Sequence, residues 1–474
     1  MVENTVAEGR YQLVIALIAK GSMNNLHRAD IVSAFRAKGV DVGFLVRDDY
    51  IDLIERLPDC RYLTCQFPPE KGRNGFWKQF CRHLRSLYPV AAEGRRYTEP
   101  RNRPWRKRLS QATLEWLSHF KVSMRQIRRL EQRLYTPIDI PGIHADDMDQ
   151  LLLLGVGAHG SEHESYLTWW AKQRGISVVH MIGNWDTFTS KGYPGAPVDT
   201  CLVWGEVMHR DAVEMHDIPE SAIKEIGCLR YDRLKDTLIE SRQAFFSRIG
   251  LDPNRRTIMY AGPLSADQYY EMLAAFEELN NEGNDLQMIF RVYPHKYFMH
   301  TPYAKPLINY ARSLPGVHVS LGDPDYRIGR RDEAVPNIEQ FELWHSLAYS
   351  DVVVNYFSTI ALEACFFDKP VISLAYRPMK DYGWIHPPKY ADHPGLTHNR
   401  RLREYGAVHM VMSREELKDS ISESIAKPDA DSEARSNTVK MELGQLDGKV
   451  SERLAEVCEQ SYLRHQADRK RVSS

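Results

Sequence analysis

Residues 351–374 read DVVVNYFSTIALEACFFDKPVISL, in which two short apolar runs lie on either side of a helix-like segment. Neither run alternates apolar with polar residues, a pattern typical of strands that helices cover on both faces. Ser358 and Thr359 stand where the helix would begin, and Pro370 opens the second run. The stretch therefore predicts a strand–helix–strand unit of a parallel sheet.

Runs of the same kind occur along the whole chain and are separated by helix-like segments. In the second half they lie at 256–262, 285–294, 316–322, 351–357, 369–376 and 407–413. In the first half they lie at 12–19, 40–48, 61–67, 149–157, 176–183 and 199–205. A chain of 474 residues also exceeds what one core usually organises. The sequence predicts an α/β protein with two tandem Rossmann-like domains, each built on a parallel sheet.

The expected domains are residues 8–235 and 255–430, followed by a helical tail at 431–474 that we expect to pack on the first domain. The first domain carries a basic insertion at about 67–148, in which aromatic residues are interspersed. One interpretation is a solvated helical insertion. The other is a basic amphipathic surface, centred on Arg95–Arg108, that holds anionic membrane lipid or a lipid-linked acceptor.

Composition narrows the class of protein. The net charge of -1 gives no reason to expect nucleic acid as a partner, and no RNA-binding signature accompanies the basic insertion. The seven cysteines are scattered and several lie in apolar runs, so we expect neither a disulfide framework nor a zinc site. The apolar run at 13–19 is too short to span a membrane, and no signal peptide is expected. The expected location is the cytoplasm, with peripheral contact to the inner face of the membrane as an option.

Strand ends carry the candidate binding residues, because ligands of parallel sheets bind at the carboxyl ends of strands. Arg291, His295 and Lys296 follow one predicted strand, and three potential cations there suit a phosphate or diphosphate. The alternative is a surface turn that happens to be basic.

The stretch at 351–374 offers a second candidate. Ser358 and Thr359 would either cap the helix or hold a phosphate together with its first N–H groups. Glu363 lies one turn after Thr359 on the same helix face, where it could accept hydrogen bonds from the ribose hydroxyls of a nucleotide. The alternative is a capped helix with an exposed glutamate.

A third polar cluster follows the strands of the first domain. Asp186 lies in NWDTFTSKG after the run at 176–183, and His159 and Glu162 lie in the Gly-rich segment GVGAHGSEHES at 155–165. That segment is no GxGxxG fingerprint, and an HExxH motif is absent, so neither a dinucleotide cofactor nor a metal is expected.

Three segments resemble glycosyltransferases of the two-Rossmann (GT-B) fold. The similarity is greatest to the branch that builds bacterial surface polysaccharides, which is related to CDP-glycerol glycerophosphotransferases. The segment at 351–374 resembles the donor-binding strand, Ser-Thr turn and helix of that superfamily. RVYPHK at 291–296 resembles its basic His-Pro turn with the order of the two residues reversed, and residues 184–232 resemble the end of its acceptor domain. The resemblance covers about residues 145–425.

The resemblance implies an enzyme that moves a sugar from a nucleotide donor to a hydroxyl of a surface-glycan or lipid-linked acceptor, as in lipopolysaccharide or capsule synthesis. Ser358 and Thr359 would hold the diphosphate, Glu363 the ribose, and Arg291, His295 or Lys296 the charge of the leaving group. Such enzymes need no metal. Many retaining members carry a second glutamate eight positions before the one matching Glu363, where this chain has Asn355.

The missing glutamate favours an inverting displacement, in which a side chain of the first domain deprotonates the acceptor. Asp186 is the preferred base, with His159 and Glu162 as alternatives. Two other reactions stay open. One is nucleotide-sugar epimerisation of the UDP-GlcNAc 2-epimerase type, and the other is glycerophosphate transfer from CDP-glycerol.

Overall fold

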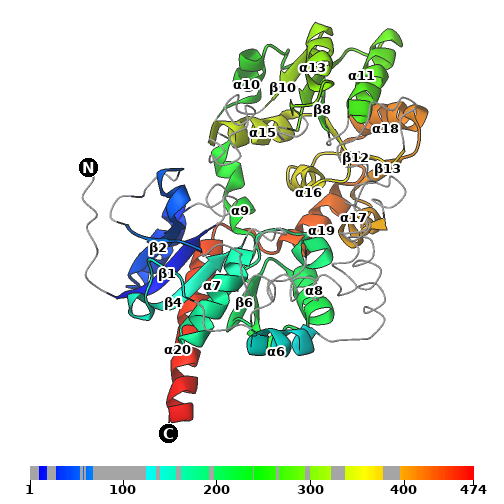
Figure 1. Cartoon of the computed structure of the whole chain (residues 1–474). Coiled ribbons are helices and arrows are strands. Elements are labelled where there is room, and N and C mark those ends of the chain that lie inside the picture. The colour runs from blue at the N-terminus through cyan, green and yellow to red at the C-terminus, as the bar shows by residue number, and fades with distance from the viewer. Residues whose placement is uncertain are drawn as a thin grey trace. The chain divides into compact units, whose positions relative to one another are not determined.

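The computed structural model describes residues 10–18, 28–53, 57, 60–67, 124–134, 139–155, 162–191, 197–238, 240–262, 266–293, 299–321, 337–376 and 395–473. These residues form two compact units (Figure 1). Unit 1 contains the described residues up to Arg233 and those from Glu442 onward, and unit 2 contains Leu234–Met441.

Unit 1 is built on a parallel sheet of seven strands in the order β3-β2-β1-β4-β5-β6-β7. The strands are β1 (Tyr11–Leu17), β2 (Val42–Arg47), β3 (Arg61–Cys65), β4 (Met148–Leu154), β5 (Ser177–Met181), β6 (Thr200–Val203) and β7 (Ile223–Glu225). Chain order reverses between β1 and β4, as in a Rossmann sheet. β1, β4, β5 and β6 are almost entirely buried, which explains their continuous apolar sequences.

The described helices of unit 1 lie between these strands and after them. They are α2 (Arg28–Ala37), α6 (Met124–Leu134), α7 (Glu162–Gln173), α8 (Glu206–His216), α9 (Leu229–Asp232) and α20 (Val450–Ser473). Short 3-10 helices occur at η1 (Asp48–Leu53), η2 (Ala145–Asp147) and η4 (Glu220–Ala222), and a π-helical turn at η3 (Thr187–Lys191). The core combines apolar strand residues with aromatic residues of α7, including the fully buried Trp170.

The last helix, α20, returns to the first sheet, as expected for the tail. Its backbone carbonyl at Cys458 accepts a hydrogen bond from the buried amide of Gln150 on β4, at 3.0 Å. Its Ser461 hydroxyl accepts another from Thr200 on β6, at 2.8 Å. Both polar side chains of the sheet thus obtain a partner from the other end of the chain, which ties α20 into unit 1.

A partly buried charge cluster also joins α20 to this sheet. Asp199 lies 2.6 Å from the ammonium of Lys172 on α7 and 3.7 Å from the imidazole of His465 on α20. Burial alone would raise the pKa of Asp199, but hydrogen bonds from His465 and Lys172 outweigh it and lower that pKa to about 2. The cluster therefore stabilises unit 1 while Asp199 is ionised.

Unit 2 is built on a parallel sheet of six strands in the order β10-β9-β8-β11-β12-β13. The strands are β8 (Arg256–Ala261), β9 (Leu286–Arg291), β10 (Val317–Ser320), β11 (Val352–Asn355), β12 (Val371–Leu374) and β13 (His409–Val411). The helices are α10 (Arg242–Ile249), α11 (Ala266–Asn281), α13 (Ala304–Ser313), α15 (Asn337–Tyr349), α16 (Thr359–Phe366), α17 (Thr397–Glu404), α18 (Arg414–Ala426) and α19 (Ser432–Leu443), with a single turn at η5 (Leu234–Thr237).

Helices cover both faces of this second sheet. On one face, alternate residues of β8 and β11 pack with α11, α13 and α18 in a single apolar cluster. On the other face, Phe245 and Phe246 of α10 pack on Ile289 of β9. Two parallel sheets, each with the Rossmann strand order, confirm the predicted fold class.

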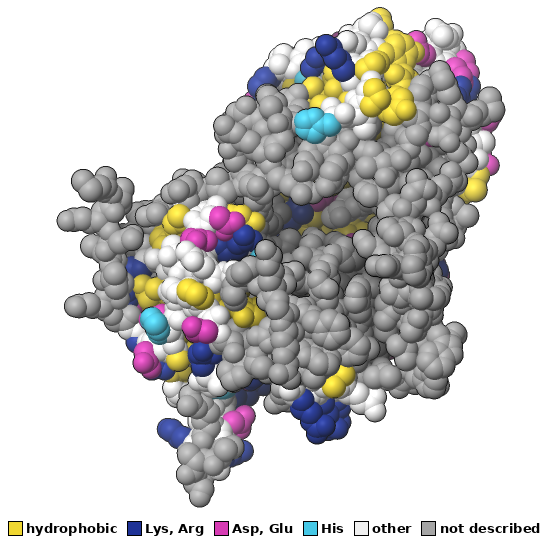
Figure 2. All heavy atoms as spheres, viewed as in Figure 1, with side chains coloured by type: hydrophobic (Ala, Val, Ile, Leu, Met, Phe, Trp, Pro, Cys, Tyr) yellow, Lys and Arg dark blue, Asp and Glu magenta, His cyan; other side chains and the backbone are white. Residues whose placement is uncertain are grey.

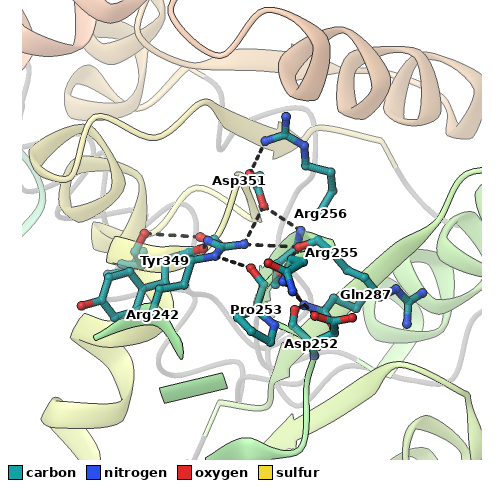
Figure 3. Close-up of polar contacts among 12 residues, drawn as sticks. Arg242, Asp252, Pro253, Arg255, Arg256, Gln287, Tyr349 and Asp351 are labelled. Atoms are coloured by element: carbon teal, nitrogen blue, oxygen red, sulfur yellow. Dashed lines mark hydrogen bonds and ion pairs between the residues drawn. The ribbon is translucent and has the colours of Figure 1, made fainter. Parts of the chain in front are cut away.

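A polar network fixes the amino ends of the strands in unit 2 (Figure 3). Asp351 accepts hydrogen bonds from the Thr257 amide and the Arg256 guanidinium, both at 2.8 Å. The guanidinium of Arg242 donates to the carbonyl of Pro253 at 2.9 Å and also bonds the carbonyl of Tyr349. The network lies at the end of the sheet opposite to the carboxyl ends of its strands. Its role there is structural.

Among the described residues, no helix is long and apolar enough to cross a membrane.

Candidate functional site

The carboxyl ends of β8 and β11 mark the most favourable ligand position in unit 2. These two strands are neighbours, and chain order reverses between them. In open parallel sheets, ligands bind beside the strand ends at such a reversal. β8 ends at Ala261, β11 ends at Asn355, and α16 starts only four residues later at Thr359.

A row of buried residues crosses the sheet at these carboxyl ends. Strand register aligns the residues of the row pair by pair, so that their side chains share one face of the sheet. From β10 to β12 the aligned residues are Ser320, Arg291, Ala261, Asn355 and Ser373. Each is at most 9% exposed, although four of the five are polar.

Burying so many polar groups at one edge is costly unless they find partners. Arg291 donates to the Ser320 hydroxyl at 2.9 Å, and the Ser373 hydroxyl donates to Oδ1 of Asn355 at 3.4 Å. The row is therefore partly satisfied within the sheet.

The turn between β11 and α16 contains two polar groups that find no partner in the described part of the chain. Oδ1 of Asn355 also accepts from the backbone N–H of Ser358, at 3.4 Å. The Nδ2 atom of Asn355 and the Oγ atom of Ser358 are buried and have no hydrogen-bond partner among the described residues. Ser358 occupies the N-cap position in extended conformation, yet its side chain does not cap the helix. Two donors and the positive end of a helix thus lie together at the strand reversal, which suits an anion.

The backbone of this turn is strained. Phe357 has a φ of 40°, a left-handed conformation that is unfavourable for residues other than glycine. Strain of this kind concentrates at functional sites, because the surrounding structure must maintain it. Phe357 precedes Ser358, so its conformation helps to set how the start of α16 is presented.

The other predicted residues of α16 lie close to the turn. Thr359 is partly exposed in the first turn of the helix, whereas Glu363 is 2% exposed and has polar partners of its own. The alternative interpretation of this segment required Glu363 to be exposed on the helix surface. Glu363 is buried instead.

Arg291 lies at the end of β9, as predicted, but it is buried beside a partly exposed charged pair. Glu342 of α15 is 3.4 Å from the imidazole of His318 on β10. Burial would raise the pKa of Glu342, but hydrogen bonds from His318 and Ser320 and the charge of Arg291 lower it to about 2. Part of the positive charge of Arg291 is therefore balanced by protein. His295 and Lys296 lie outside the described residues.

In unit 1, only one of the three proposed catalytic side chains is described. Asp186 is partly exposed just before η3, after the end of β5, and its backbone carbonyl accepts a hydrogen bond from Thr189 at 3.3 Å. Glu162 begins α7, but its side chain lies outside the described part of the structure, as does the whole of His159. The catalytic roles of His159 and Glu162 stay predictions. The membrane contact expected for Arg95–Arg108 also stays a prediction, because these residues lie outside the described part of the structure.

The structure adds a buried acid–base pair that the sequence interpretation did not single out. His180 on β5 and Glu164 on α7 approach to 3.8 Å, and each side chain is 3% exposed. Burial lowers the pKa of His180 to about 4, so its imidazole is neutral at neutral pH. The ring packs on Gly155, where a Cβ atom would lie 2.4 Å from Nε2. The sequence carried one signal for this pair, because His180 is the only titratable residue in the apolar run SVVHM.

Within the described residues, no group of three or more His, Cys, Asp or Glu side chains is placed to hold a metal ion. Metal-independent chemistry stays a prediction.

Comparison with known proteins extends the description of the fold. No protein-family model matches the sequence, and no curated protein matches it at a significant level. UDP-GlcNAc 2-epimerase from Methanocaldococcus jannaschii aligns over 94% of this chain and 99% of its own, with a TM-score of 0.51 and 12% identity. The Neisseria meningitidis UDP-GlcNAc 2-epimerase, solved with UDP-GlcNAc bound, aligns over 96% and 99%, with a TM-score of 0.52 and 11% identity.

The chain has the GT-B fold. A glycosyltransferase from Rickettsia africae ESF-5 is also similar, with a TM-score of 0.47 and 10% identity over 95% of this chain and 98% of its own. At such low identity, the likeness to the two epimerases establishes the fold and leaves the reaction open.

Proposed function

We propose that unit 2 binds a nucleotide sugar and that the protein transfers its sugar to an acceptor hydroxyl. The observation that carries the proposal is the turn after β11. There, Nδ2 of Asn355 and Oγ of Ser358, which are buried and have no partner within the described segments, lie at the start of α16 and at the strand reversal of the sheet. Such an arrangement suits the diphosphate of a nucleotide.

The proposed donor site uses the residues that the sequence singled out. Ser358, Thr359 and the first N–H groups of α16 bind the diphosphate, and Glu363 orients the ribose. Arg291, with His295 and Lys296, offsets the charge that develops on the departing nucleotide. Arg291 is buried and donates to Ser320. We therefore propose that its positive charge stabilises the phosphate through space, without a direct bidentate hydrogen bond.

The proposed reaction is a single displacement with inversion. The acceptor hydroxyl attacks the anomeric carbon as the bond to the diphosphate breaks, and a base takes the hydroxyl proton. Asp186 is the proposed base, with His159 and Glu162 as alternatives. A surface glycan or a lipid-linked sugar, as in lipopolysaccharide or capsule synthesis, is the proposed acceptor, and the cytoplasm is the proposed location.

Epimerisation of a nucleotide sugar is the second candidate. It is favoured by the fold likeness to two UDP-GlcNAc 2-epimerases, each aligned over at least 94% of this chain. Both reactions require the same nucleotide site, so the turn after β11 supports each of them. The sequence resemblance of residues 351–374 to a donor-binding segment places transfer first, with glycerophosphate transfer from CDP-glycerol as a further variant.

Two experiments test the proposal in order. First, melting temperatures are measured with UDP, GDP, CDP and TDP, because a ligand stabilises the state that binds it. A rise with one nucleotide, lost in Ser358→Ala with the fold intact by circular dichroism, supports the site. No rise with any nucleotide contradicts it.

The second experiment separates the reactions. The radiolabelled sugar conjugate of the stabilising nucleotide is incubated with and without a membrane extract as acceptor. Release of free nucleotide that depends on the acceptor supports sugar transfer. Isomerisation of the sugar without acceptor supports the epimerase and overturns the transferase. Release of nucleotide that depends on the acceptor and occurs from CDP-glycerol but from no sugar conjugate would assign the glycerophosphate variant.

A further inference from the structure

Helix α6, the described part of the basic insertion, carries a stripe of three arginines. Arg125, Arg129 and Arg133 recur every four residues, which places them one above another on the same side of the helix. All three are exposed, and none has an ion-pair partner among the described residues. Like charges at this spacing destabilise a helix. Among the described residues, no carboxylate offsets the repulsion within this stripe.

A fourth arginine fixes this helix to unit 1. The guanidinium of Arg128 donates to the backbone carbonyls of His216 at 2.6 Å and Asp217 at 3.2 Å, at the carboxyl end of α8. A cation is favourable there because it meets unpaired carbonyls and the negative end of the helix dipole. The arginine stripe is therefore presented by an anchored helix rather than by a free one.

The exposed side of α6 combines this charge with an apolar side chain. Leu130 directly follows Arg129 in sequence and is 37% exposed. In Figure 2, Lys and Arg side chains gather beside hydrophobic ones at the lower margin, where Figure 1 places α6. Arginines next to an exposed leucine are typical of helices that lie in the surface of an anionic membrane. Platforms for single-stranded RNA stack bases on aromatic rings, and the described exposed side chains of α6 include none.

We propose that α6 docks unit 1 on an anionic phospholipid surface. The guanidinium groups of Arg125, Arg129 and Arg133 bind lipid phosphates, and Leu130 enters the boundary between headgroups and acyl chains. Guanidinium forms strong charge-assisted hydrogen bonds with phosphate. The proposal does not depend on the nucleotide site of unit 2. It uses a segment other than Arg95–Arg108.

The test is co-sedimentation of the full-length protein with vesicles. One set contains phosphatidylcholine with about 30% phosphatidylglycerol, which gives the vesicles a negative surface potential. The other set contains phosphatidylcholine alone. Each basic residue near an anionic surface contributes roughly fivefold to partitioning, so the triple variant R125Q/R129Q/R133Q should bind the anionic vesicles on the order of 100-fold more weakly. Raising the salt to about 1 M should also release the wild type.

A matched variant controls for total charge. K305Q/R312Q/K427Q removes three exposed cations from helices α13 and α18 and their borders in unit 2. It should keep vesicle binding within a few-fold of the wild type, and neither variant should have a lower melting temperature than the wild type.

Equal binding to anionic and neutral vesicles would overturn the proposal, and so would equal binding of the wild type and the α6 variant. The same holds if single-stranded RNA, but not vesicles, binds in a way that requires the α6 arginines. The nucleotide-induced rise in melting temperature serves as a separate readout, since loss of vesicle binding should leave it unchanged.

Discussion

The substitution Asn355→Asp isolates the electrostatics of the candidate nucleotide site. Asp has nearly the shape of Asn, and its Oδ1 can keep the two hydrogen bonds that Asn355 accepts from the Ser358 amide and the Ser373 hydroxyl. Only Nδ2, which has no partner among the described residues, is replaced by an oxygen. The change thus converts a buried donor at the start of α16 into an anion, with little change of packing.

The expected loss of nucleotide binding is large because the position is fully buried. A carboxylate about 4 Å from a phosphate repels it by about 4 kcal/mol at an effective dielectric constant of about 20. That energy corresponds to roughly a thousandfold increase in Kd. Burial also raises the pKa of the new carboxyl group, so binding should recover as the pH falls and the group becomes neutral. Folding itself should lose about 1–3 kcal/mol, the range for a buried polar group that lacks full hydrogen bonding.

Isothermal titration calorimetry with the nucleoside diphosphate that most stabilises the wild type measures this effect, at pH 5 and pH 8. Ser373→Ala is the matched control, because it removes a neighbour from the same polar row without adding charge. We expect it to change Kd by less than about tenfold, since the net worth of one hydrogen bond is about 1 kcal/mol. If Asn355→Asp binds the nucleotide like the wild type at pH 8, the diphosphate does not lie at the start of α16.

Three further predictions concern stability, measured by urea denaturation. Gly155→Ala should cost about 1–3 kcal/mol because its Cβ overlaps the imidazole that packs there, whereas Gly395→Ala, with open space around it, should be nearly neutral. The carboxyl group of Asp199 has a pKa of about 2 in the folded protein, against 3.8 for the free side chain. This difference adds about 2 kcal/mol to the free energy of unfolding above pH 4, and the contribution is lost as the pH falls towards 2. The variant Asp199→Ala should lack this acid dependence. Arg435→Met should lower the free energy of unfolding by about 2 kcal/mol. This is less than for a fully buried ion pair, because its partner Asp368 is half exposed. An unchanged urea midpoint would show that the pair does not stabilise the protein.

Strand positions followed well from the sequence where both faces of a strand are buried. The runs at 12–19 and 176–183 became β1 and β5 within two residues at each end. β7 was missed because it has only three residues, Ile223–Glu225, two of which face solvent at the edge of the sheet. An edge strand of that length leaves no continuous apolar run, so its existence depends on pairing with β6 rather than on its own sequence.

The candidate site followed from the sequence only in part. Ser358, Thr359 and Glu363 were identified from the spacing along one segment, and the structure places all three at the start of α16 or within it. The polar row was not foreseen, because it joins five different strands and depends on their register. Asn355 had been noted only as a missing glutamate. Its alignment with Ala261 and Ser373 is a property of the assembled sheet.

The two ends of α16 show how strain relates to function in this unit. Each end contains a non-glycine residue in the left-handed conformation, Phe357 with φ of 40° before the helix and Asp368 with φ of 53° after it. At the carboxyl end, Asp368 accepts hydrogen bonds from the buried Arg435 at 2.7 Å and from Ser432 at 2.8 Å, so protein contacts offset its strain. At the amino end, the strained turn instead holds buried donors for which the described part of the chain offers no acceptor.

Strain of this kind is expected where a protein keeps a conformation for binding rather than for stability. Replacing Phe357 by glycine should relieve about 1 kcal/mol of left-handed backbone strain. It also removes a partly buried ring that packs on the core of unit 2, so we expect a net loss of stability. The same change should weaken nucleotide binding, because a more mobile turn no longer holds the start of α16 ready for the diphosphate. Asp368→Gly provides the comparison, since it loses the contacts with Arg435 and should destabilise the protein. If Phe357→Gly left nucleotide affinity unchanged, the strained turn would have no part in binding.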